Sequence, residues 1–270
     1  MLRSEGDRLT RVVVCSPGKE YFGVKNLKTH NIAERANSEK ATQQHDELKK
    51  ALRDFDAEVI DADELAAHPN SVFTRDASLC TPQGYIQLRM GLASRQGEEE
   101  WMAQILEELK EPRAGQIHSP GTVEGGDIIL ASKVAFIGHS QRSNRSGIRQ
   151  LSGLLKKMGY EIRVAEIPPP HLHLGGLMSL VGPEHVFSCR GFFDRDFFKG
   201  FERIEVDCEM FVSGNVICLG DGELIAEASN TPPIEALEKR GFRVHVLDLS
   251  EFIKGQGGPS CLVLPVTRVA

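Results

Sequence analysis

A glycine-rich turn in this sequence carries two acids at a spacing that suits chemistry. In Gly-Thr-Val-Glu-Gly-Gly-Asp, residues 121–127, Glu124 and Asp127 precede an apolar run that is typical of a buried strand. Gly-Asp pairs also form ordinary solvated turns, and for this stretch alone that alternative stays open. Other stretches of the chain supply the partners that the two acids would need in a reactive site.

Cys261 is the candidate nucleophile. It follows Gly-Gln-Gly-Gly-Pro-Ser, residues 255–260, in which the glycines allow the backbone to approach a ligand closely. A thiol attacks as its thiolate, which nearby positive charge favours, and the leaving group needs a proton donor. The alternative is a buried structural cysteine, the usual environment of a free thiol.

Two of the nine histidines, His171 and His173, stand out as candidate proton donors. Three prolines precede them and two glycines follow, so the chain is fixed on one side and open on the other. In an extended segment both imidazoles would share one face, and the residues alone do not choose between them. A hydrogen bond from an imidazole N–H to the Glu124 carboxylate would raise the pKa of that imidazole and keep it available as a general acid.

Asp76 is the candidate anchor for a cation. It ends the segment Asn-Ser-Val-Phe-Thr-Arg-Asp, residues 70–76, in which Phe73 could cover a planar cation held by the carboxylate. A salt bridge to the adjacent Arg75, or a strand-end cap, is the structural alternative. Together with Cys261 and a histidine, this acid indicates a cysteine hydrolase that acts on a cationic substrate.

Two arginines follow expected strands at loop positions. Arg95 lies in Ala-Ser-Arg-Gln-Gly-Glu, and Arg142 lies in Gly-His-Ser-Gln-Arg-Ser-Asn. A pair of guanidinium groups suits bidentate binding of a substrate carboxylate. Solvated surface arginines are the alternative for each residue alone.

Strand pairs alternate with helices about five times along the chain, and these elements must position the candidate residues. Apolar runs such as 128–131 and 134–138 are followed by an amphipathic helical pattern such as 144–158. This alternation predicts a cyclic α/β repeat architecture, with a doubly wound α/β fold as the alternative.

Three local predictions accompany this architecture. A helix over residues 38–55 has Ser38 as its expected N-cap. A short helix is expected over residues 192–201, and a final strand over residues 261–265 would begin at Cys261.

The composition is that of an ordinary soluble protein. Of the 270 residues, 40% are hydrophobic and 26% are charged, and the formal net charge is -6. This acidity argues against a nucleic-acid partner, which would favour a clustered basic face. The first residues lack the apolar core of a signal peptide and no apolar run reaches membrane-spanning length, so we expect a cytoplasmic protein without a membrane partner.

The six cysteines are scattered along the chain, and most of them follow apolar, strand-like residues. They lie at positions 15, 80, 189, 208, 218 and 261. This pattern predicts reduced, buried thiols, and no Cys-x-x-Cys pair indicates zinc.

Six motifs together resemble the guanidino-group modifying enzymes, most closely the short dimethylarginine dimethylaminohydrolases, with arginine deiminases as near relatives. In chain order they are Asn-Ser-Val-Phe-Thr-Arg-Asp (70–76), Ala-Ser-Arg-Gln-Gly-Glu (93–98), Gly-Thr-Val-Glu-Gly-Gly-Asp (121–127), Gly-His-Ser-Gln-Arg-Ser-Asn (138–144), His-Leu (173–174) and Gly-Gly-Pro-Ser-Cys (257–261). Each motif is weak alone, but six in the order of the family cover nearly the whole chain. The resemblance implies one pentein catalytic domain over residues 1–270, a five-bladed α/β propeller of ββαβ repeats.

By this resemblance Cys261 is the nucleophile, His173 the general acid and base, and Glu124 the carboxylate partner of His173. Asp76 orients the guanidinium, and the positive charge of the guanidinium helps the thiolate to form. Attack at the central carbon leads to a covalent thiouronium while His173 protonates the departing amine. Water activated by the same imidazole then releases citrulline. The resemblance implies no metal and no organic cofactor.

The resemblance also implies a set of substrate-binding residues. This set comprises Asn70, Phe73, Asp76, Arg95, Arg142 and Asp127. Within it, Arg95 and Arg142 match arginines that hold the substrate α-carboxylate, and Asp127 matches an acid that supports the site.

Three positions depart from the family pattern and bear on the substrate. Asn70 and Arg75 stand where the dimethylarginine enzymes commonly have an aspartate and a glutamate, which resembles the deiminase version. Gly175 stands where deiminases usually carry a second aspartate after the catalytic histidine. A pocket with one guanidinium-binding acid favours an N-substituted arginine.

We therefore expect hydrolysis of N-omega-methylated arginine to citrulline and a methylamine. A compact arginine deiminase is the main alternative. An amidinotransferase and a non-catalytic pentein binding protein are further alternatives. The sequence leaves open whether the chain forms a homodimer.

Overall fold

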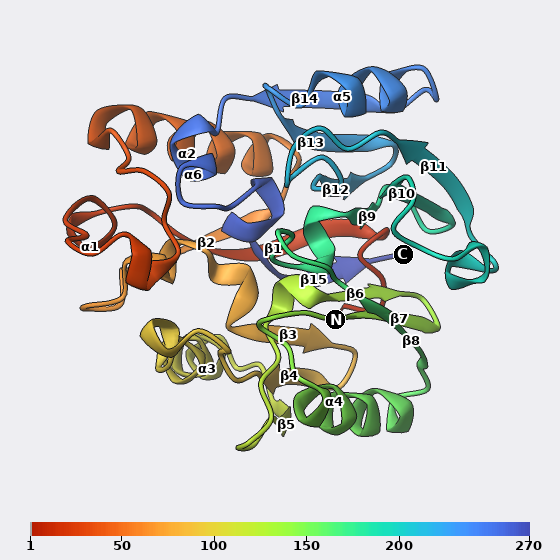
Figure 1. Ribbon diagram of the computed structural model, residues 1–270, viewed down its shortest axis with the longest axis horizontal. Helices are drawn as coiled ribbons and strands as arrows, with labels where there is room; N and C mark the ends of the chain where they lie inside the picture. Colours follow the sequence, from red (N-terminus) through yellow and green to blue (C-terminus); the bar gives the residue numbers. More distant parts are fainter. Residues whose placement is uncertain (1) are drawn as a thin grey trace.

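Short strands organise the chain into five similar units. The computed structural model describes residues 2–270, and within this range the strands form five three-stranded sheets. In each sheet the middle strand pairs antiparallel with one neighbour and parallel with the other. The sheets surround a common centre, and the longer helices lie at the periphery (Figure 1). The expected cyclic repeat is confirmed, and the doubly wound alternative is wrong.

The sheets follow one another along the chain, except that the last strand completes the first sheet. They are β15 (Leu264–Val269), β1 (Arg8–Cys15) and β2 (Glu58–Ala62); β3 (Ser78–Thr81), β4 (Gly84–Gln87) and β5 (Arg113–Gln116); β6 (Ile128–Ala131), β7 (Val134–His139) and β8 (Glu161–Glu166); β9 (Met178–Leu180), β10 (His185–Cys189) and β11 (Glu202–Val206); β12 (Ile217–Gly220), β13 (Glu223–Glu227) and β14 (Arg243–Leu247). The antiparallel pairing of β15 with β1 closes the ring.

Helices make the crossovers that parallel strand pairs require. The crossover helices are α2 (Ser38–Asp54), α3 (Glu98–Glu108), α4 (Arg145–Lys157) and α5 (Thr231–Glu238), with α1 (Lys19–Phe22) and α6 (Ser250–Ile253) as single turns elsewhere. Each crossover helix turns its apolar residues inward, as Ile148, Leu151 and Leu155 show in α4. Sequence analysis missed β5 and β11, because both are short and largely polar.

Two helix predictions need correction. Helix α2 begins at Ser38, but its N-cap is Asn37, whose side-chain oxygen accepts a hydrogen bond from the Lys40 amide at 3.0 Å. The helix expected over residues 192–201 is a 3-10 turn, Arg195–Phe198. Glycines with positive φ, Gly191 and Gly200, bracket this turn, and its phenylalanines pack into the core instead of following a helical stripe.

One pair of cysteines contradicts the prediction of reduced thiols. Cys189 and Cys208 form a disulfide, with their Cα atoms 5.5 Å apart. Their pairing depends on tertiary structure, because strand register places Cys189 opposite Val206 in the neighbouring strand. Within residues 2–270 the free cysteines are Cys15, Cys80, Cys218 and Cys261.

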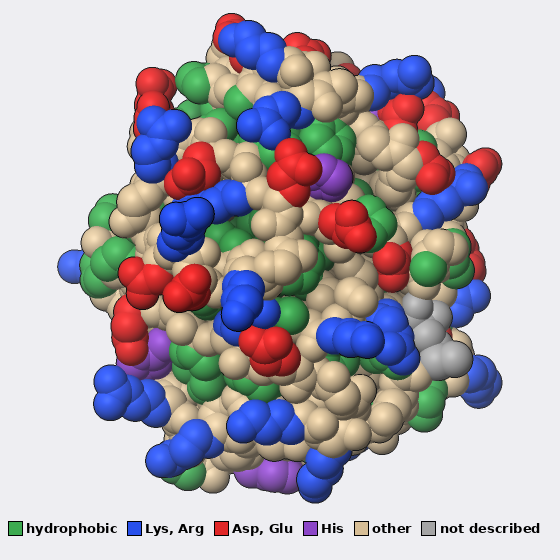
Figure 2. Space-filling view, turned by 90° about the vertical axis from the view of Figure 1, so that its right-hand side faces the viewer, with side chains coloured by type: hydrophobic (Ala, Val, Ile, Leu, Met, Phe, Trp, Pro, Cys, Tyr) green, Lys and Arg blue, Asp and Glu red, His purple; other side chains and the backbone are tan. Residues whose placement is uncertain are grey.

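Two further features concern the helices and the surface charge. No helix in the described part of the chain is long and apolar enough to cross a membrane. On the face shown in Figure 2, basic and acidic side chains are interspersed.

An aromatic cluster in the core offers a test of the packing. Phe136 in β7 is fully buried, and its ring centroid lies 5.1 to 5.6 Å from those of Phe197, Phe198 and Phe201. We expect Phe136→Ala to lower the free energy of unfolding by about 3–5 kcal/mol, because it removes buried aromatic contacts and leaves a cavity. Urea unfolding followed by circular dichroism measures this loss.

A matched control lies on the next strand. Val164 in β8 is 47% exposed. The variant Val164→Ala should stay within about 0.5 kcal/mol of the parent protein. Equal losses for the two variants would contradict the assignment of Phe136 to the core.

Candidate active site

Asp76 and the three predicted catalytic residues lie on or beside short turns that enter the innermost strand of four sheets. These turns are η3 (Thr74–Asp76) before β3, η5 (Gly125–Asp127) before β6, η6 (Leu174–Gly176) before β9 and η8 (Pro259–Leu262) before β15. Asp76 ends the first turn, Glu124 and His173 are the N-caps of the next two, and Cys261 lies in the last. The expectation that Cys261 begins a strand is therefore wrong, since the strand starts at Leu264.

Gly126 allows these turns to approach one another. Its amide donates a hydrogen bond to Asp76 Oδ1 at 2.9 Å. A Cβ atom at this position would lie 2.6 Å from His173 Nδ1 and 2.8 Å from Asp76 Oδ1. Because no other residue fits that space, glycine is needed here for close packing of the acid turn against the imidazole.

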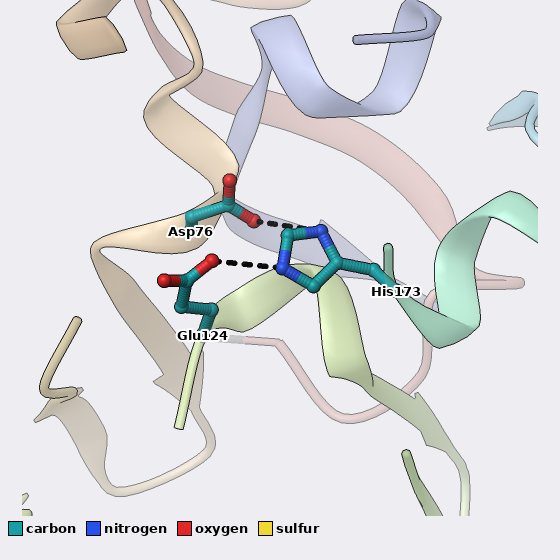
Figure 3. Close-up of side chains that lie close together, drawn as sticks. All are labelled: Asp76, Glu124 and His173. Carbon is teal, nitrogen blue, oxygen red and sulfur yellow. Dashed lines mark hydrogen bonds and ion pairs between the residues drawn. The ribbon is translucent and has the colours of Figure 1, made fainter. Parts of the chain in front are cut away.

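His173 lies between two carboxylates (Figure 3). Its Nε2 is 2.8 Å from Glu124 Oε2, and its Nδ1 is 3.8 Å from Asp76 Oδ1. Burial favours the neutral ring, but the charges of Asp76 and Asp127 and the hydrogen bond to Glu124 outweigh it and raise the pKa of His173 to about 9. The imidazole is therefore protonated at neutral pH.

His171 lies in a different environment from His173. Its ring packs edge-on against Phe192, with the ring centroids 4.8 Å apart. Burial lowers the pKa of His171. His171 ends a turn that its amide closes on the Pro168 carbonyl at 3.1 Å, whereas His173 contacts Glu124 and Asp76, so the geometry favours His173 as the histidine of the site.

Glu124 is fixed by several donors. Its Oε1 accepts hydrogen bonds from the amides of Gly91 and Leu92 at 2.9 and 3.2 Å, and Arg142 Nη1 lies 3.3 Å from both carboxylate oxygens. Burial opposes ionisation, but the hydrogen bond with His173 and the charge of Arg142 hold the pKa of Glu124 below its usual range. The carboxylate is therefore ionised and cannot rotate away from the imidazole.

Asp127 is buried behind the turn that carries Glu124. It accepts hydrogen bonds from the hydroxyls of Ser140 and Ser143 at 2.5 and 2.6 Å and from the Leu174 amide at 2.9 Å. Burial raises the pKa of this carboxyl group. Through the Leu174 amide, Asp127 holds the backbone directly after His173.

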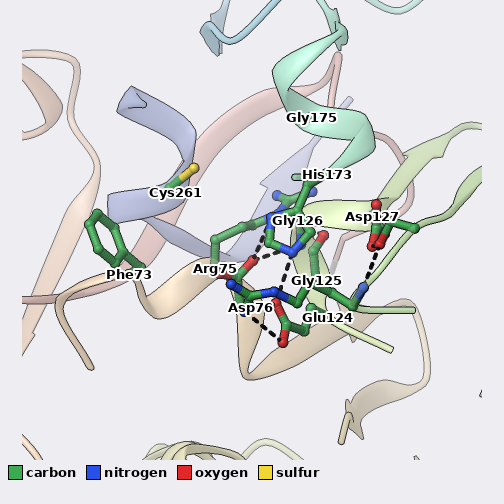
Figure 4. Close-up of polar contacts among 12 residues, drawn as sticks. Phe73, Arg75, Asp76, Glu124, Gly125, Gly126, Asp127, His173, Gly175 and Cys261 are labelled. Carbon is green, nitrogen blue, oxygen red and sulfur yellow. Dashed lines mark hydrogen bonds and ion pairs between the residues drawn. The ribbon is translucent and has the colours of Figure 1, made fainter. Parts of the chain in front are cut away.

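Asp76 pairs with Arg95, so the alternative of a salt bridge to Arg75 is wrong. Arg95 Nη1 lies 2.6 Å from Asp76 Oδ2, while Arg95 Nε and Nη2 bind Glu98 Oε2 at 2.9 and 2.7 Å. Arg75 instead pairs with Glu5 at 2.7 Å. The Arg75 guanidinium also donates to the carbonyls of Gly125 and Ile128, whereas Asp76 accepts a hydrogen bond from the Gly126 amide (Figure 4).

The two predicted arginines are both buried and both engaged with acids. Four of the five N–H bonds of Arg95 point at Asp76, Glu98 and the Phe73 carbonyl, which leaves one Nη1 hydrogen for another ligand. Arg142 contacts Glu124 only through Nη1. Neither arginine is a solvated surface residue, so that alternative is wrong.

Cys261 completes the group. Its Sγ accepts a hydrogen bond from the Gly258 amide at 3.4 Å and lies 3.9 Å from Asn215 Nδ2. Burial and the nearby charge of Asp76 raise the pKa of the thiol to about 11. In the absence of a bound cation, Cys261 is therefore a neutral thiol beside a protonated imidazole.

Two cavities meet at this cysteine and histidine. The smaller cavity opens beside them, and the predicted residues that line it are Asn70, Phe73, Asp76, Arg95, Arg142, His173 and Cys261. The larger cavity continues towards Arg75 and Arg268 and shares His173 and Cys261 with the first. Among the predicted residues, Glu124 and Asp127 lie behind the walls of both cavities.

Three polar residues near the site were not identified from the sequence. Glu98 follows Arg95 by three residues, a spacing that could have indicated an ion pair. His30 lines the smaller cavity from a 3-10 turn, Lys28–His30, whose sequence carries no motif. Asn215 precedes an inner strand, as the predicted residues do, and this position was its only signal.

The same side chains also offer atoms that could approach a metal ion. Ligand atoms of Asp76, Glu124 and His173 lie within 4.8 Å of one another. Each of them already has a protein partner, however, and a protonated imidazole has no free lone pair for a metal. This donor set fits an organic cation better than a metal ion.

Comparison with known proteins agrees with this geometry. Residues 24–268 match the family described as N,N dimethylarginine dimethylhydrolase, eukaryotic. The N(G),N(G)-dimethylarginine dimethylaminohydrolase of Pseudomonas aeruginosa is 32% identical over 225 residues, which cover 83% of this chain and 88% of the relative. An arginine deiminase of Limosilactobacillus reuteri is 24% identical over 74% of this chain and 62% of its own length.

A solved structure shows the same fold. The Pseudomonas aeruginosa dimethylarginine dimethylaminohydrolase, as a cysteine-to-serine mutant complexed with citrulline, superposes with a TM-score of 0.83 and 27% identity. The superposition covers 95% of this chain and 99% of that chain. With a family match that spans most of the sequence, the five sheets are those of a pentein, and the chain belongs to the dimethylarginine dimethylaminohydrolase family.

Proposed function

We propose that this protein hydrolyses N-omega-methylated arginine to citrulline and the corresponding methylamine. The observation that carries the proposal is the position of the His173 imidazole, which lies between Glu124 and Asp76 beside a cavity that Cys261 also lines. The family relationship supports the reaction class, because relatives over most of the chain are dimethylarginine dimethylaminohydrolases.

The substrate supplies the charge that activates the nucleophile. The guanidinium enters the smaller cavity and lies against the Asp76 carboxylate, with Phe73 beside it. Burial and the Asp76 carboxylate keep the pKa of Cys261 raised; the positive charge of the guanidinium offsets the carboxylate, and the thiol then loses its proton to solvent. The thiolate therefore forms only when the electrophile is bound, and the free enzyme keeps an unreactive thiol.

In the first half of the reaction, the Cys261 thiolate attacks the guanidinium carbon and a C–S bond forms. The positive charge is neutralised in the tetrahedral intermediate. His173 then gives its proton to the substituted nitrogen, the C–N bond breaks, and neutral methylamine or dimethylamine departs. A cationic S-alkylthiouronium remains on Cys261, and His173 is now neutral.

In the second half, water replaces the amine. Neutral His173 takes a proton from the water while its oxygen attacks the thiouronium carbon. The C–S bond then breaks, and the electron pair returns to sulfur as the thiolate. Loss of a proton to solvent gives citrulline, and the imidazolium is restored for the next cycle.

The amino-acid end of the substrate faces the two arginines. We infer that Arg142 binds the α-carboxylate, since it lines the cavity and contacts Glu124 only through Nη1. Arg95 can donate its one free Nη1 hydrogen to the same carboxylate, but its main role is to balance the charge of Asp76. Asn70 lines the same cavity, and its Oδ1 has no hydrogen-bond partner within residues 2–270, so it can accept a bond from the substrate.

Three broader points belong to the same proposal. We infer that residues 1–270 act as one catalytic domain, because the proposed catalytic residues come from turns of separate sheets. A homodimer and a cytoplasmic location remain predictions. The Cys189–Cys208 disulfide argues against the second, since disulfides persist mainly in oxidising compartments.

The first test is release of citrulline from purified protein. Asymmetric dimethylarginine, monomethylarginine and arginine are compared at equal concentration, and the methylated substrates should give the faster release. The Cys261→Ser variant should lose turnover by about a thousandfold or more, because it removes the nucleophile. Preference for arginine would instead identify a compact deiminase, and full activity of Cys261→Ser would exclude the thiol mechanism.

The second test separates the two neighbouring histidines. His173→Ala should lower kcat by about a hundredfold or more, because it removes the proton donor and the general base. His171→Ala is the matched control and should stay near the parent rate, since His171 packs on Phe192 instead of the acids. The reverse pattern would overturn the assignment of His173.

The third test uses pH. The pKa of His173 is raised to about 9, so the required imidazolium is present below that pH and kcat should fall as pH rises through about 9. Glu124→Gln removes one of the acids that raise this pKa, and the alkaline limb should therefore move to lower pH. An alkaline limb that does not move would contradict the Glu124–His173 pairing.

The free energy of unfolding should depend on the same titration of His173. A group whose pKa is raised by folding contributes stability below its unfolded pKa, here 6.5, and loses the contribution as pH rises through its folded pKa of about 9. Thermal unfolding at each pH shows whether loss of activity reflects this titration or loss of the fold.

A further inference from the structure

The ring of sheets places one more polar side chain at the centre. Four sheets present proposed site residues on the turn before the innermost strand, and in the fifth sheet the same position holds Asn215. It lies two residues before β12 (Ile217–Gly220) and is 2% exposed. Asn215 lines the larger of the two cavities together with Cys261 and His173.

The side-chain amide of Asn215 links the two segments that carry the proposed catalytic residues. Its Nδ2 lies 2.9 Å from the carbonyl oxygen of Gly175, two residues after His173, and 2.8 Å from the hydroxyl of Ser260. Its Oδ1 accepts a hydrogen bond from the Ser260 amide at 2.9 Å. One amide group thus fixes the backbone beside the histidine relative to the backbone beside the cysteine.

The same amide is close to the reactive sulfur. Asn215 Nδ2 lies 3.9 Å from Cys261 Sγ, a long contact for a neutral thiol. A thiolate attracts N–H donors more strongly than a thiol does, because the acceptor is charged. Within the described residues, two N–H donors lie near this sulfur: the Gly258 amide at 3.4 Å and the side-chain amide of Asn215.

The loop around Asn215 does not depend on the Asn215 side chain. The Gly214 amide donates to the Gly176 carbonyl at 2.9 Å, and the Val216 amide donates to the Ser179 hydroxyl at 3.2 Å. Asn230 Nδ2 also binds two carbonyl oxygens of this loop, those of Val212 and Ser213. A side chain that the loop does not need for its own structure is free to serve the site.

We propose that Asn215 is a positioning residue of this reaction, which holds Cys261 in register with His173 and donates a hydrogen bond to the Cys261 thiolate. The bond forms when the thiol loses its proton and again when the thiolate leaves the thiouronium. The proposal rests on the proposed function only in taking Cys261 as the nucleophile.

The test measures the ionisation of the Cys261 thiol in the substrate-free protein. The rate of alkylation by iodoacetamide is followed against pH by mass spectrometry of the peptide that contains Cys261. In Asn215→Ala the midpoint of the profile should rise by about one pH unit, because a hydrogen bond to a charged acceptor is lost. With methylated arginine, kcat should fall about tenfold while KM stays within about threefold.

Two further variants separate this role from simple structural support. The two N–H groups of Asn215 Nδ2 face the Gly175 carbonyl and the Ser260 hydroxyl, and the second of them can turn to sulfur when the thiolate forms. Ser260→Ala removes the competing hydroxyl and frees this N–H for sulfur, so its alkylation midpoint should not rise above that of the parent protein. Asn215→Asp keeps the shape and the acceptor for the Ser260 amide, but it loses the donor and adds a negative charge. Its midpoint should therefore rise at least as far as that of Asn215→Ala.

The readouts distinguish the failures. Unchanged midpoints in both Asn215 variants, or equal shifts in Ser260→Ala and Asn215→Ala, would overturn the proposal. If Asn215→Ala does not fold by circular dichroism, the isosteric Asn215→Asp variant decides alone. Because alkylation needs no substrate, the result stands even if the protein hydrolyses no methylated arginine.

Discussion

The structure of the site depends on a buried chain of charges that alternate in sign. Glu98, Arg95, Asp76, His173, Glu124 and Arg142 follow one another in this order, and each lies near an oppositely charged neighbour. Isolated charges in a protein interior are very costly, whereas paired and hydrogen-bonded charges are tolerated. The protonated His173 is therefore a stable part of the fold, and removal of any one member would leave an unbalanced charge beside the others.

This charge chain is a consequence of the propeller. Each sheet delivers a short turn to the common centre, and the turns approach so closely that Gly126 has no room for a side chain. The inner strands fix the backbone on one side of every turn, so the side chains are held without a long loop. The result is a rigid group of side chains of the kind that catalysis by preorganised electrostatics requires.

Arg75 shows that neighbours in sequence need not share a role. It follows Thr74 and precedes Asp76, yet it turns to Glu5 and to the carbonyls of Gly125 and Ile128. These hydrogen bonds support the turn that carries Glu124. Asp76 is then the acid of its segment that faces the guanidinium. A single carboxylate at this wall agrees with a substrate that carries methyl groups on one nitrogen, since such a nitrogen donates fewer hydrogen bonds.

The sequence by itself determined which residue types meet, because the motifs of Asp76, Glu124, His173 and Cys261 each lie where an apolar run begins and strand alternation predicts a repeated α/β unit. Only the tertiary structure decided the partners. It paired Asp76 with Arg95, joined Cys189 to Cys208, separated His171 from His173 and brought in Asn215. These contacts join positions far apart in the chain or depend on the direction of a turn, and periodicity describes neither. They arise when the β15–β1 pairing closes the ring and brings the five turns to one centre.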